Sequence, residues 1–415
     1  MNMIRPSLFV VTILILTVSI VSFVFFDNNF FIRKWNIPLA TPGFLDSRQF
    51  AWASEAHAQG YDPLVENPVN PNGHPLNYPR IWHMFFALGI NESHTNIIGS
   101  IVVILFFIGV GVFWFSNKFD TLTYFLLSIV ILSPAVVLGI ERSNIELILF
   151  FILSLALTVN YYSNISAFFL FVFASILKLY PVFGFVYLLK ENKRRFWVLF
   201  LSALGIFILY AILTLDDLML VYKTTPKLVG SSLGLNVWWM GLLHPRFFNL
   251  PLSDSLVLIL KSLSYISAFL ILSATFYFSI LHKNAGLFRP GKYINAFRVG
   301  SAIYIGCFLI INSHDYRLIF LIFTIPQLVA WLRDKENGLS LVPLVTLSAI
   351  LFLLWNAFIM RFLGRKLTFA MEEFSSWIVL AGLLFLFFSS LPDWFRNYLR
   401  RPFSIIKRNS KSIAS

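Results

Sequence analysis

Charged residues are scarce in this sequence. Asp, Glu, Lys and Arg make up 12% of the 415 residues, whereas 58% are hydrophobic. A soluble domain carries about 25% charged residues, so this composition excludes an ordinary soluble enzyme. The mean hydropathy of +0.78 points the same way. We expect most of the chain to lie in lipid.

Several familiar site signatures are absent as well. The single cysteine, Cys307, excludes an intrachain disulfide. The sequence holds no Walker A loop, no dinucleotide-binding glycine fingerprint, no HExxH and no paired-cysteine zinc spacing. A nucleotide-driven pump is therefore not expected, and we predict neither a cofactor nor a metal site.

The net charge of +13 could suggest nucleic acid, but its distribution argues against that partner. The segments Lys190–Arg195, His282–Arg298 and 392–415 carry net charges of +3, +4 and +5, which is nearly all of the total. Each segment is short and lies beside an apolar run. This is the pattern of cytoplasmic loops under the positive-inside rule, so no nucleic-acid partner is predicted.

Long apolar runs fill the remainder of the chain and predict an all-α, polytopic membrane protein, because only helices or closed barrels satisfy the backbone in lipid. Ser7–Phe26 is interpreted as an uncleaved anchor. The other apolar runs are Asn96–Phe115, Thr121–Ile140, Ile145–Asn160, Ile165–Leu189, Phe196–Leu215, Ser255–Leu281, Val299–Asn312, Leu318–Leu332, Leu341–Met360 and Ser375–Leu391.

Residues 1–415 are expected to form a single membrane domain, with polar loops at 27–95 and 216–254 and a basic cytoplasmic tail at 392–415. The first loop is the longest polar interval. Within it, Ser47–Ala58 and Arg80–Ile90 have helical patterns that suit helices lying on the membrane surface.

The run Ile165–Leu189 contains Lys178 and Pro181, which would break a helix. If every run crosses the membrane, Asp46 and His314 fall on opposite faces. If Ile165–Leu189 instead enters and returns, about 10 helices cross and both residues share the outer face. We predict this re-entrant hairpin, with helical arms of roughly 20 and 12 Å.

Asp46, in the first loop, supports two interpretations. It could be a general base. It could equally cap the helix Ser47–Ala58, because Asp46 and Gln49 have the spacing of a capping box. The two roles are compatible only if one carboxylate oxygen stays free.

Three further polar groups interrupt the apolar runs. Glu141, Arg142 and Asn144 form either an interfacial turn or a surface that faces a substrate headgroup. Lys178 lies deep in an apolar run, at a cost of about 3 kcal/mol, and either snorkels or faces an anion. The third group is the turn 312–317.

The turn 312–317 reads Asn-Ser-His-Asp-Tyr-Arg, and its candidate site residues are His314, Asp315 and Arg317. A charged interfacial loop is the alternative. Arg361, Arg365 and Lys366 form a smaller basic group, which is more simply a solvated loop than a phosphate site.

The order of these motifs resembles the GT-C superfamily of membrane glycosyltransferases. The first span, the loop with Asp46, the turn 60–63 and the pair Tyr78–Pro79 are similar to the opening of such enzymes. The turn 141–146 and the motif Lys178–Pro181 resemble glycosyltransferase family 87 in particular. Family members often have Gly-Gln before the central Asn and a second Pro where this chain has Arg80.

The resemblance implies a GT-C-like fold, an extracytoplasmic active site in the cell membrane and inverting transfer from a polyprenyl-phosphate sugar. Mannose would be one such sugar, and a glycan or glycolipid would be the acceptor. Asp46 would be the general base. The donor and substrate residues would be Lys178, Tyr180, Glu141, Arg142, Asn144, His314, Asp315, Arg317, Tyr78 and Arg80. A lipid-linked glycan polymerase or ligase and a flippase are the alternatives.

Overall fold

The computed structural model describes residues 4–26, 30–226, 229–282, 290–310, 312–334 and 341–402. These residues are almost entirely helical, as predicted, and the only strands among them are two short ones. Seven helical segments are long and apolar enough to cross a membrane. They are α1 (Ile4–Phe26), α4 (Thr95–Ser116), α9 (Lys193–Leu213), α12 (Asp254–Phe276) with the π-helical turn η4 (Tyr277–Leu281), the 3₁₀ helix η5 (Asp315–Thr324) with α14 (Ile325–Arg333), α15 (Leu341–Leu363) and α16 (Arg365–Ser389).

The other apolar helices are shorter or bent. They are α7 (Glu146–Val159), α8 (Asn164–Leu177) and α13 (Ile294–Ile310), together with the pair α5 (Thr121–Ile131) and α6 (Pro134–Arg142). That pair bends by 49° where Pro134, which has no N–H to donate, begins α6. By length and apolarity alone, the described residues contain seven candidate crossings, or eight if the bent pair is one span, against about ten predicted. The helix α7, with 14 residues, measures only about 21 Å, so the predicted number of crossings stays a prediction.

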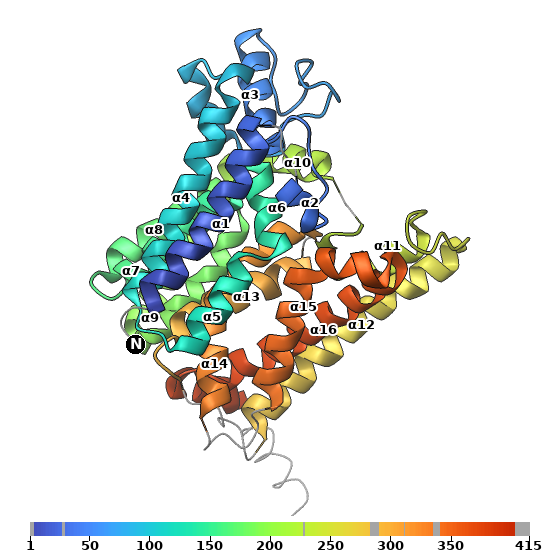
Figure 1. Ribbon diagram of the computed structural model, residues 1–415. Coiled ribbons are helices and arrows are strands. Elements are labelled where there is room, and N and C mark those ends of the chain that lie inside the picture. Colours follow the sequence, from blue (N-terminus) through green and yellow to red (C-terminus); the bar gives the residue numbers. More distant parts are fainter. Residues whose placement is uncertain are drawn as a thin grey trace, which may run out of the picture.

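The helices form two groups around a buried centre (Figure 1). In one group, α1 packs on α4 and α5, and α7 packs on α4 and α8. In the other, α16 packs on α12 and α15. The central elements are α13 and η5, whose Phe297, Phe308 and Phe320 are at most 1% exposed.

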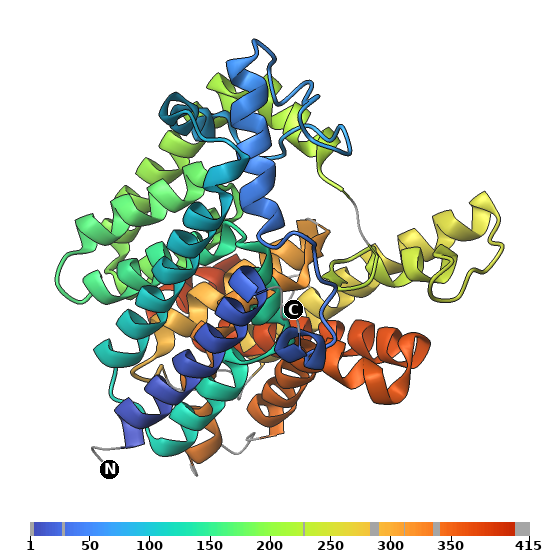
Figure 2. The same cartoon turned by 45° about the horizontal axis from the view of Figure 1, so that its top comes forward.

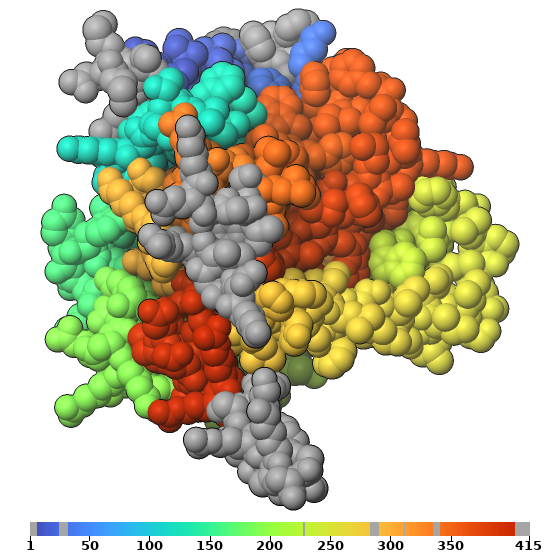
Figure 3. Space-filling model, turned by 90° about the horizontal axis from the view of Figure 1, so that it is seen from below, coloured from blue at the N-terminus to red at the C-terminus, as the bar shows by residue number. Residues whose placement is uncertain are grey.

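The basic segments gather at one end of the molecule, which Figure 3 shows face on. Residues 393–402 lie against the start of α9, where the ring of Phe196 is 5.2 Å from that of Trp394. The guanidinium of Arg298 donates to the carbonyl of Ser390. The predicted cytoplasmic segments are therefore neighbours, although residues 283–289, 335–340 and 403–415 lie outside the described residues.

The predicted break near Lys178 is confirmed, and the chain reverses there. Beyond it, the 3₁₀ helix η3 (Tyr180–Lys190) runs back along α8, so that Tyr187 stacks on Phe171 with ring centroids 4.3 Å apart. At the far end, Lys190 Nζ donates to Asn164 Oδ1 over 2.6 Å. A Cβ on Gly184 would lie 2.6 Å from the Phe171 ring, so glycine permits this close packing.

The second arm differs from the prediction in type and length. Its 11 residues form a 3₁₀ helix, which rises about 2.0 Å per residue and so measures roughly 22 Å instead of 12 Å. The 14 residues of α8 give about 21 Å at 1.5 Å per residue. Because the arms match in length, both ends of the hairpin meet at Asn164 and Lys190.

The polar loops contain the remaining elements. In Figures 1 and 2, α3 and α10 project from the end opposite residues 393–402, whereas α2 and α11 lie about midway along the bundle. The first loop holds α2 (Phe30–Lys34), α3 (Leu45–Ala58) and the 3₁₀ helices η1 (Arg80–Leu88) and η2 (Glu92–His94). The second holds α10 (Leu215–Thr224), β1 (Ser232–Leu233) and α11 (Val237–Leu243). Strand β1 pairs antiparallel with β2 (Ser313–His314), with Ser232 opposite His314, and so joins the second loop to the turn 312–317.

Candidate functional site

Asp46 lies in the first turn of α3 and does not cap it. The helix begins at Leu45, and its N-cap is Phe44 in the left-handed conformation, with φ of 59°. The N–H of Phe44 donates to the carbonyl of Glu141 over 3.0 Å, which fixes the start of α3 against α6. The predicted capping box is therefore wrong, and the Asp46 carboxylate is available for another role.

The carboxylate of Asp46 faces the polar turn after α6. The side-chain amide of Asn144 donates to Asp46 Oδ2. Burial raises the pKa of Asp46 above its ordinary value, against the lowering effects of Arg142, the Asn144 amide and Lys178. A carboxylate with a raised pKa is a stronger base, which suits proton abstraction.

Asn144 connects Asp46 to a second carboxylate. Its Oδ1 accepts the backbone N–H of Glu146 over 2.9 Å. The turn that presents it passes through Ser143, which has a left-handed φ of 49°. Ser143 Oγ accepts a hydrogen bond of 2.8 Å from Ser47 on α3, which ties the two elements together.

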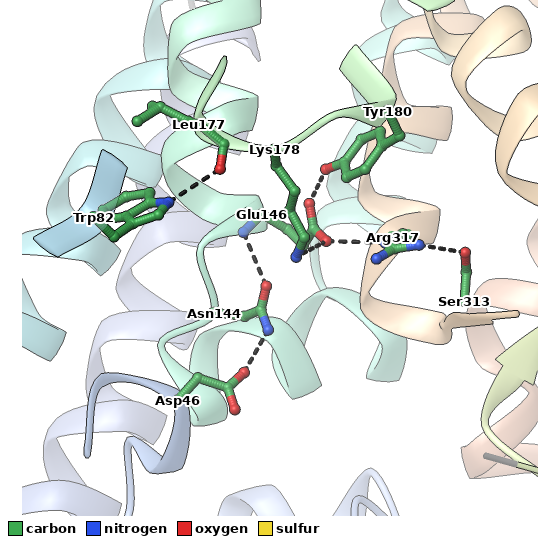
Figure 4. Close-up of polar contacts among 9 residues, drawn as sticks. All are labelled: Asp46, Trp82, Asn144, Glu146, Leu177, Lys178, Tyr180, Ser313 and Arg317. Carbon is green, nitrogen blue, oxygen red and sulfur yellow. Dashed lines mark hydrogen bonds and ion pairs between the residues drawn. The ribbon is translucent and has the colours of Figure 1, made fainter. Parts of the chain in front are cut away.

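Glu146 is the centre of the cluster, and its side chain is fully buried. Its Oε1 lies 2.9 Å from Lys178 Nζ and 3.0 Å from Arg317 Nε. The Tyr180 hydroxyl donates to Oε2. Figure 4 shows that these side chains converge from α7, the hairpin tip and η5. One carboxylate therefore holds two cations side by side.

Aromatic rings cover both cations. Lys178 Nζ lies 5.3 Å from the centroid of the Tyr78 ring. The guanidinium carbon of Arg317 lies 4.9 Å from the centroid of the Tyr180 ring. Both distances are within cation–π range. Lys178 therefore points into the protein at the hairpin tip, which excludes the snorkelling interpretation.

The first loop holds the hairpin tip in place. Trp82 Nε1 donates to the carbonyl of Leu177 over 3.0 Å, and the Tyr210 hydroxyl donates to the carbonyl of Ile176 over 3.3 Å. These carbonyls end α8 and have no intrahelical partner. The backbone just before Lys178 is thus anchored from η1 and α9.

The predicted residues Glu141 and Arg142 lie beside the cluster around Glu146 but form no hydrogen bond or ion pair with it in the described contacts. Glu141 Oε1 accepts the N–H of Ala40 over 2.8 Å, and Oε2 lies 3.0 Å from Arg142 Nε. A terminal nitrogen of Arg142 also donates to the carbonyl of Pro38. Together they position the segment that leads into α3, and Arg142 adds positive charge near Asp46.

His314 was predicted as a cation or hydrogen-bond donor at the site. Its ring stacks on Tyr316 with centroids 5.0 Å apart. Burial, with a smaller contribution from the positive charge of Arg317, lowers the pKa of His314 to about 4. The imidazole is therefore neutral near pH 7, so His314 can serve as a donor but not as a cation.

Asp315 and Arg80 make contacts outside the cluster. Asp315 Oδ2 faces α15, where Asn356 Nδ2 lies 3.5 Å away. Arg80 is 2.8 Å from both Asp62 and Asp217, and its side chain is 41% exposed. Arg80 thus ties the first loop to α10.

Sequence reasoning missed Glu146. Glu146 is a lone acid at the start of an apolar run, two residues after Asn144. That isolation was a usable signal, because a buried acid needs a partner. Within the described residues, no group of three or more His, Cys, Asp or Glu side chains could hold a metal ion.

Comparisons with known proteins give no match: no family model, no curated protein and no solved structure is similar to this chain. The chemistry of the cluster is therefore the basis for a functional conclusion. The half-buried carboxylate of Asp46 is joined through the Asn144 amide to Glu146, whose carboxylate holds two cations. Such an arrangement can bind an anion and accept a proton at neighbouring points.

Proposed function

We propose that the protein is an inverting membrane glycosyltransferase that moves a hexose from a polyprenyl-phosphate donor to a glycan or glycolipid acceptor. Mannose is one such hexose. The observation that carries the proposal is the continuous chain of bonds from Asp46 through Asn144 and Glu146 to Lys178 and Arg317. Figure 4 lets the reader follow this chain.

The proposed reaction uses both ends of that chain. Asp46 takes the proton from the acceptor hydroxyl, and the hydroxyl oxygen forms a bond to the anomeric carbon. The bond from that carbon to the phosphate oxygen breaks, and its electron pair remains on the departing polyprenyl phosphate. Lys178 and Arg317 stabilise the charge that develops there, and Tyr180 and Tyr78 flank the two cations.

The distribution of charge supports an active site on the extracytoplasmic face of the cell membrane. The basic segments around Arg195, Arg298 and Arg396 lie at one end of the molecule. The positive-inside rule assigns that end to the cytoplasm. The first loop, which contains α3 and Asp46, projects from the other end, where a glycan acceptor would be available. The second loop pairs with the turn 312–317 through β1.

The hairpin of α8 and η3 supports a re-entrant segment in this arrangement. Its ends meet at Asn164 and Lys190 on the cytoplasmic side, and its tip carries Lys178. Non-helical backbone at membrane depth is tolerated where it is buried in protein or lines a cavity. The extended conformation of Lys178, between two arms, satisfies that condition.

The test is sugar transfer by purified protein in detergent, with polyprenyl-phosphate mannose and polyprenyl-phosphate glucose as donors. The envelope lipid fraction supplies the acceptor. We expect sugar to move between lipids without a sealed compartment. Transport without transfer, after reconstitution into vesicles, would favour a flippase. Transfer only from a diphosphate donor would favour a polymerase or ligase.

A further inference from the structure

A second group of cations lies where α2 meets the joined ends of α15 and α16. The basic patch consists of Arg33 and Lys34 at the end of α2, Arg361 at the end of α15, and Arg365 and Lys366 at the start of α16. All five residues are exposed. None of them belongs to the cluster around Glu146.

Hydrogen bonds bring the parts of the basic patch together. Arg361 donates to the carbonyl of Lys34 over 2.9 Å. Asn36 Nδ2 donates to the carbonyl of Ala357 over 2.7 Å, one turn before Arg361. Figure 2 shows α2 beside the joined ends of α15 and α16. The patch is therefore built from segments more than 300 residues apart in the chain.

Four of the five cations in the patch have no ion-pair partner among the described residues. In the part of the chain that the structure describes, Arg33, Arg361, Arg365 and Lys366 form no ion pair. The nearest acids along α16, Glu372 and Glu373, are buried. Arg365 also begins a 25-residue helix whose N-cap, Gly364, makes no side-chain capping bond, so the positive end of the helix dipole adds to the field.

An exposed apolar stripe begins on α16 next to Arg365 and Lys366 and runs along the helix. It is formed by Leu367, Met371 and Phe374, which are 52%, 37% and 69% exposed. Their spacing of four and three residues places them on one face of the helix. Phe362, 73% exposed, lies at the end of α15 beside Arg361. Cations at a span end above an apolar stripe match the headgroup and tail of a lipid.

We propose that the basic patch binds the phosphate headgroup of an anionic membrane lipid, whose acyl chain lies along the stripe on α16. In the orientation proposed above, this patch is on the outer face, where the positive-inside rule gives no reason for cations. The inference does not require that the protein transfer sugar.

The segment 36–44 links the basic patch to the residues around Asp46. Within that segment, Pro38 accepts from Arg142, and Ala40 donates to Glu141. Asn36, at its start, is bonded to α15. A headgroup held at the patch would therefore fix the chain that leads to Asp46.

The test is native mass spectrometry of the full-length protein with phosphatidylglycerol in competition with phosphatidylcholine. We expect the triple variant R361Q/R365Q/K366Q to bind phosphatidylglycerol at least tenfold more weakly than the wild type. The matched control is K193Q/R194Q/R195Q, which removes three exposed cations from the start of α9. It should bind within about twofold of the wild type.

A second variant separates the effect of lost charge from the effect of changed side chains on folding. R361K/R365K keeps the positive charge and should keep the affinity, because lysine also binds phosphate, as a point charge. Inorganic phosphate at millimolar concentration should not displace the lipid. Unchanged affinity in the triple glutamine variant, or an equal loss in the α9 control, would overturn the proposal.

Discussion

At the scale of single residues, Glu146 determines whether Lys178 and Arg317 can share one site. The two cations have only 15% and 12% of their side chains exposed and lie on the same carboxylate oxygen. Without that carboxylate, they would face each other in a buried environment. Removing one partner of a buried ion pair costs about 3–5 kcal/mol, because the other charge stays buried.

Glu146→Gln should therefore lower the stability of the free protein by roughly 3 kcal/mol. Thermal denaturation in detergent measures the change. Glu66→Gln is the matched control, since Glu66 is exposed and forms no ion pair among the described residues. Equal melting temperatures for both variants would show that Glu146 does not hold the cations.

The pH dependence of transfer should report on Asp46. The carboxylate must be deprotonated to act as a base, and burial raises its pKa above the ordinary value of 3.8. Transfer should therefore fall as pH drops through a midpoint above 3.8. Arg142→Gln removes the cation that lowers this pKa most, so the midpoint should move to higher pH.

The measurement is the pH profile of kcat/KM for the wild type and Arg142→Gln. Arg333→Gln is the control, because Arg333 pairs with Asp120 at the other end of the molecule. Its profile should match that of the wild type. A midpoint that stays fixed, or moves to lower pH, in Arg142→Gln would remove Asp46 from the base role.

The sequence patterns predicted which residues belong to the site but not which of them contact one another. Asp46, Asn144, Lys178, Tyr180 and Arg317 were predicted site residues, and the structure gathers them. The partners of Glu146 lie 32 and 171 positions away along the chain, and no local pattern encodes such contacts. The start of α3 was misplaced because Phe44 bonds to the distant Glu141 carbonyl.

At the scale of elements, the hairpin of α8 and η3 is the device that delivers Lys178 to Glu146. Trp82 fixes its tip through the Leu177 carbonyl. A buried carbonyl that loses its donor costs about 1–3 kcal/mol. The next residue is Lys178, so movement of the tip shifts the cation.

Trp82→Phe removes this donor. A loss of about 1.4 kcal/mol in transition-state stabilisation, within the range of 1–3 kcal/mol above, corresponds to transfer that is roughly tenfold slower. Trp355→Phe loses an equivalent bond, from Trp355 Nε1 to the Ile129 carbonyl, away from the site. It should lower stability but not the transfer rate of the folded fraction. Comparable rates for both variants would show that the tip does not depend on Trp82.

The position of the hairpin break was predictable, but the shape of the second arm was not. Pro181 disfavours a continuing α-helix, and Lys178 is costly in an apolar run. The residues of η3 pack on α8, where the Tyr187 ring stacks on the Phe171 ring, and these contacts are not local in the sequence. Such long 3₁₀ helices are uncommon, so local propensity gives no reason to expect one.

At the scale of the whole molecule, the proposal requires the loops and the basic ends to lie on opposite sides of the membrane. Cysteine labelling on a Cys307→Ser background tests this. Ser54 would be a natural probe position in the first loop, but it is buried. The exposed residues Gln59 and Tyr162 are better positions, and Tyr162 is 89% exposed.

In intact cells, an impermeant maleimide should label Gln59→Cys and should reach Tyr162→Cys only after the membrane is permeabilised. Cys307 is buried, so its own thiol should react slowly with the maleimide, and the replacement by Ser removes what background is left. The reverse labelling pattern would place Asp46 in the cytoplasm. That result would contradict an extracytoplasmic active site.

Composition and charge pattern predicted the class of this molecule, and the predicted number of crossings stays a prediction. The scarcity of charge and the long apolar runs identified an all-helical membrane protein. Apolar runs such as Val299–Asn312 are too short to reveal whether they cross, since α13 is enclosed by protein rather than by lipid. Burial within a bundle and burial in a bilayer favour the same residues.

The most direct test of glycosyl transfer by this cluster compares wild type with Asp46→Asn. Asn cannot accept the proton, but its side-chain oxygen can still accept the hydrogen bond from Asn144. In detergent, with polyprenyl-phosphate mannose as donor and the envelope lipid fraction as acceptor, we predict transfer by the wild type. Asp46→Asn should bind the donor normally and transfer at least about a hundredfold more slowly. Transfer by Asp46→Asn at the wild-type rate would contradict the account.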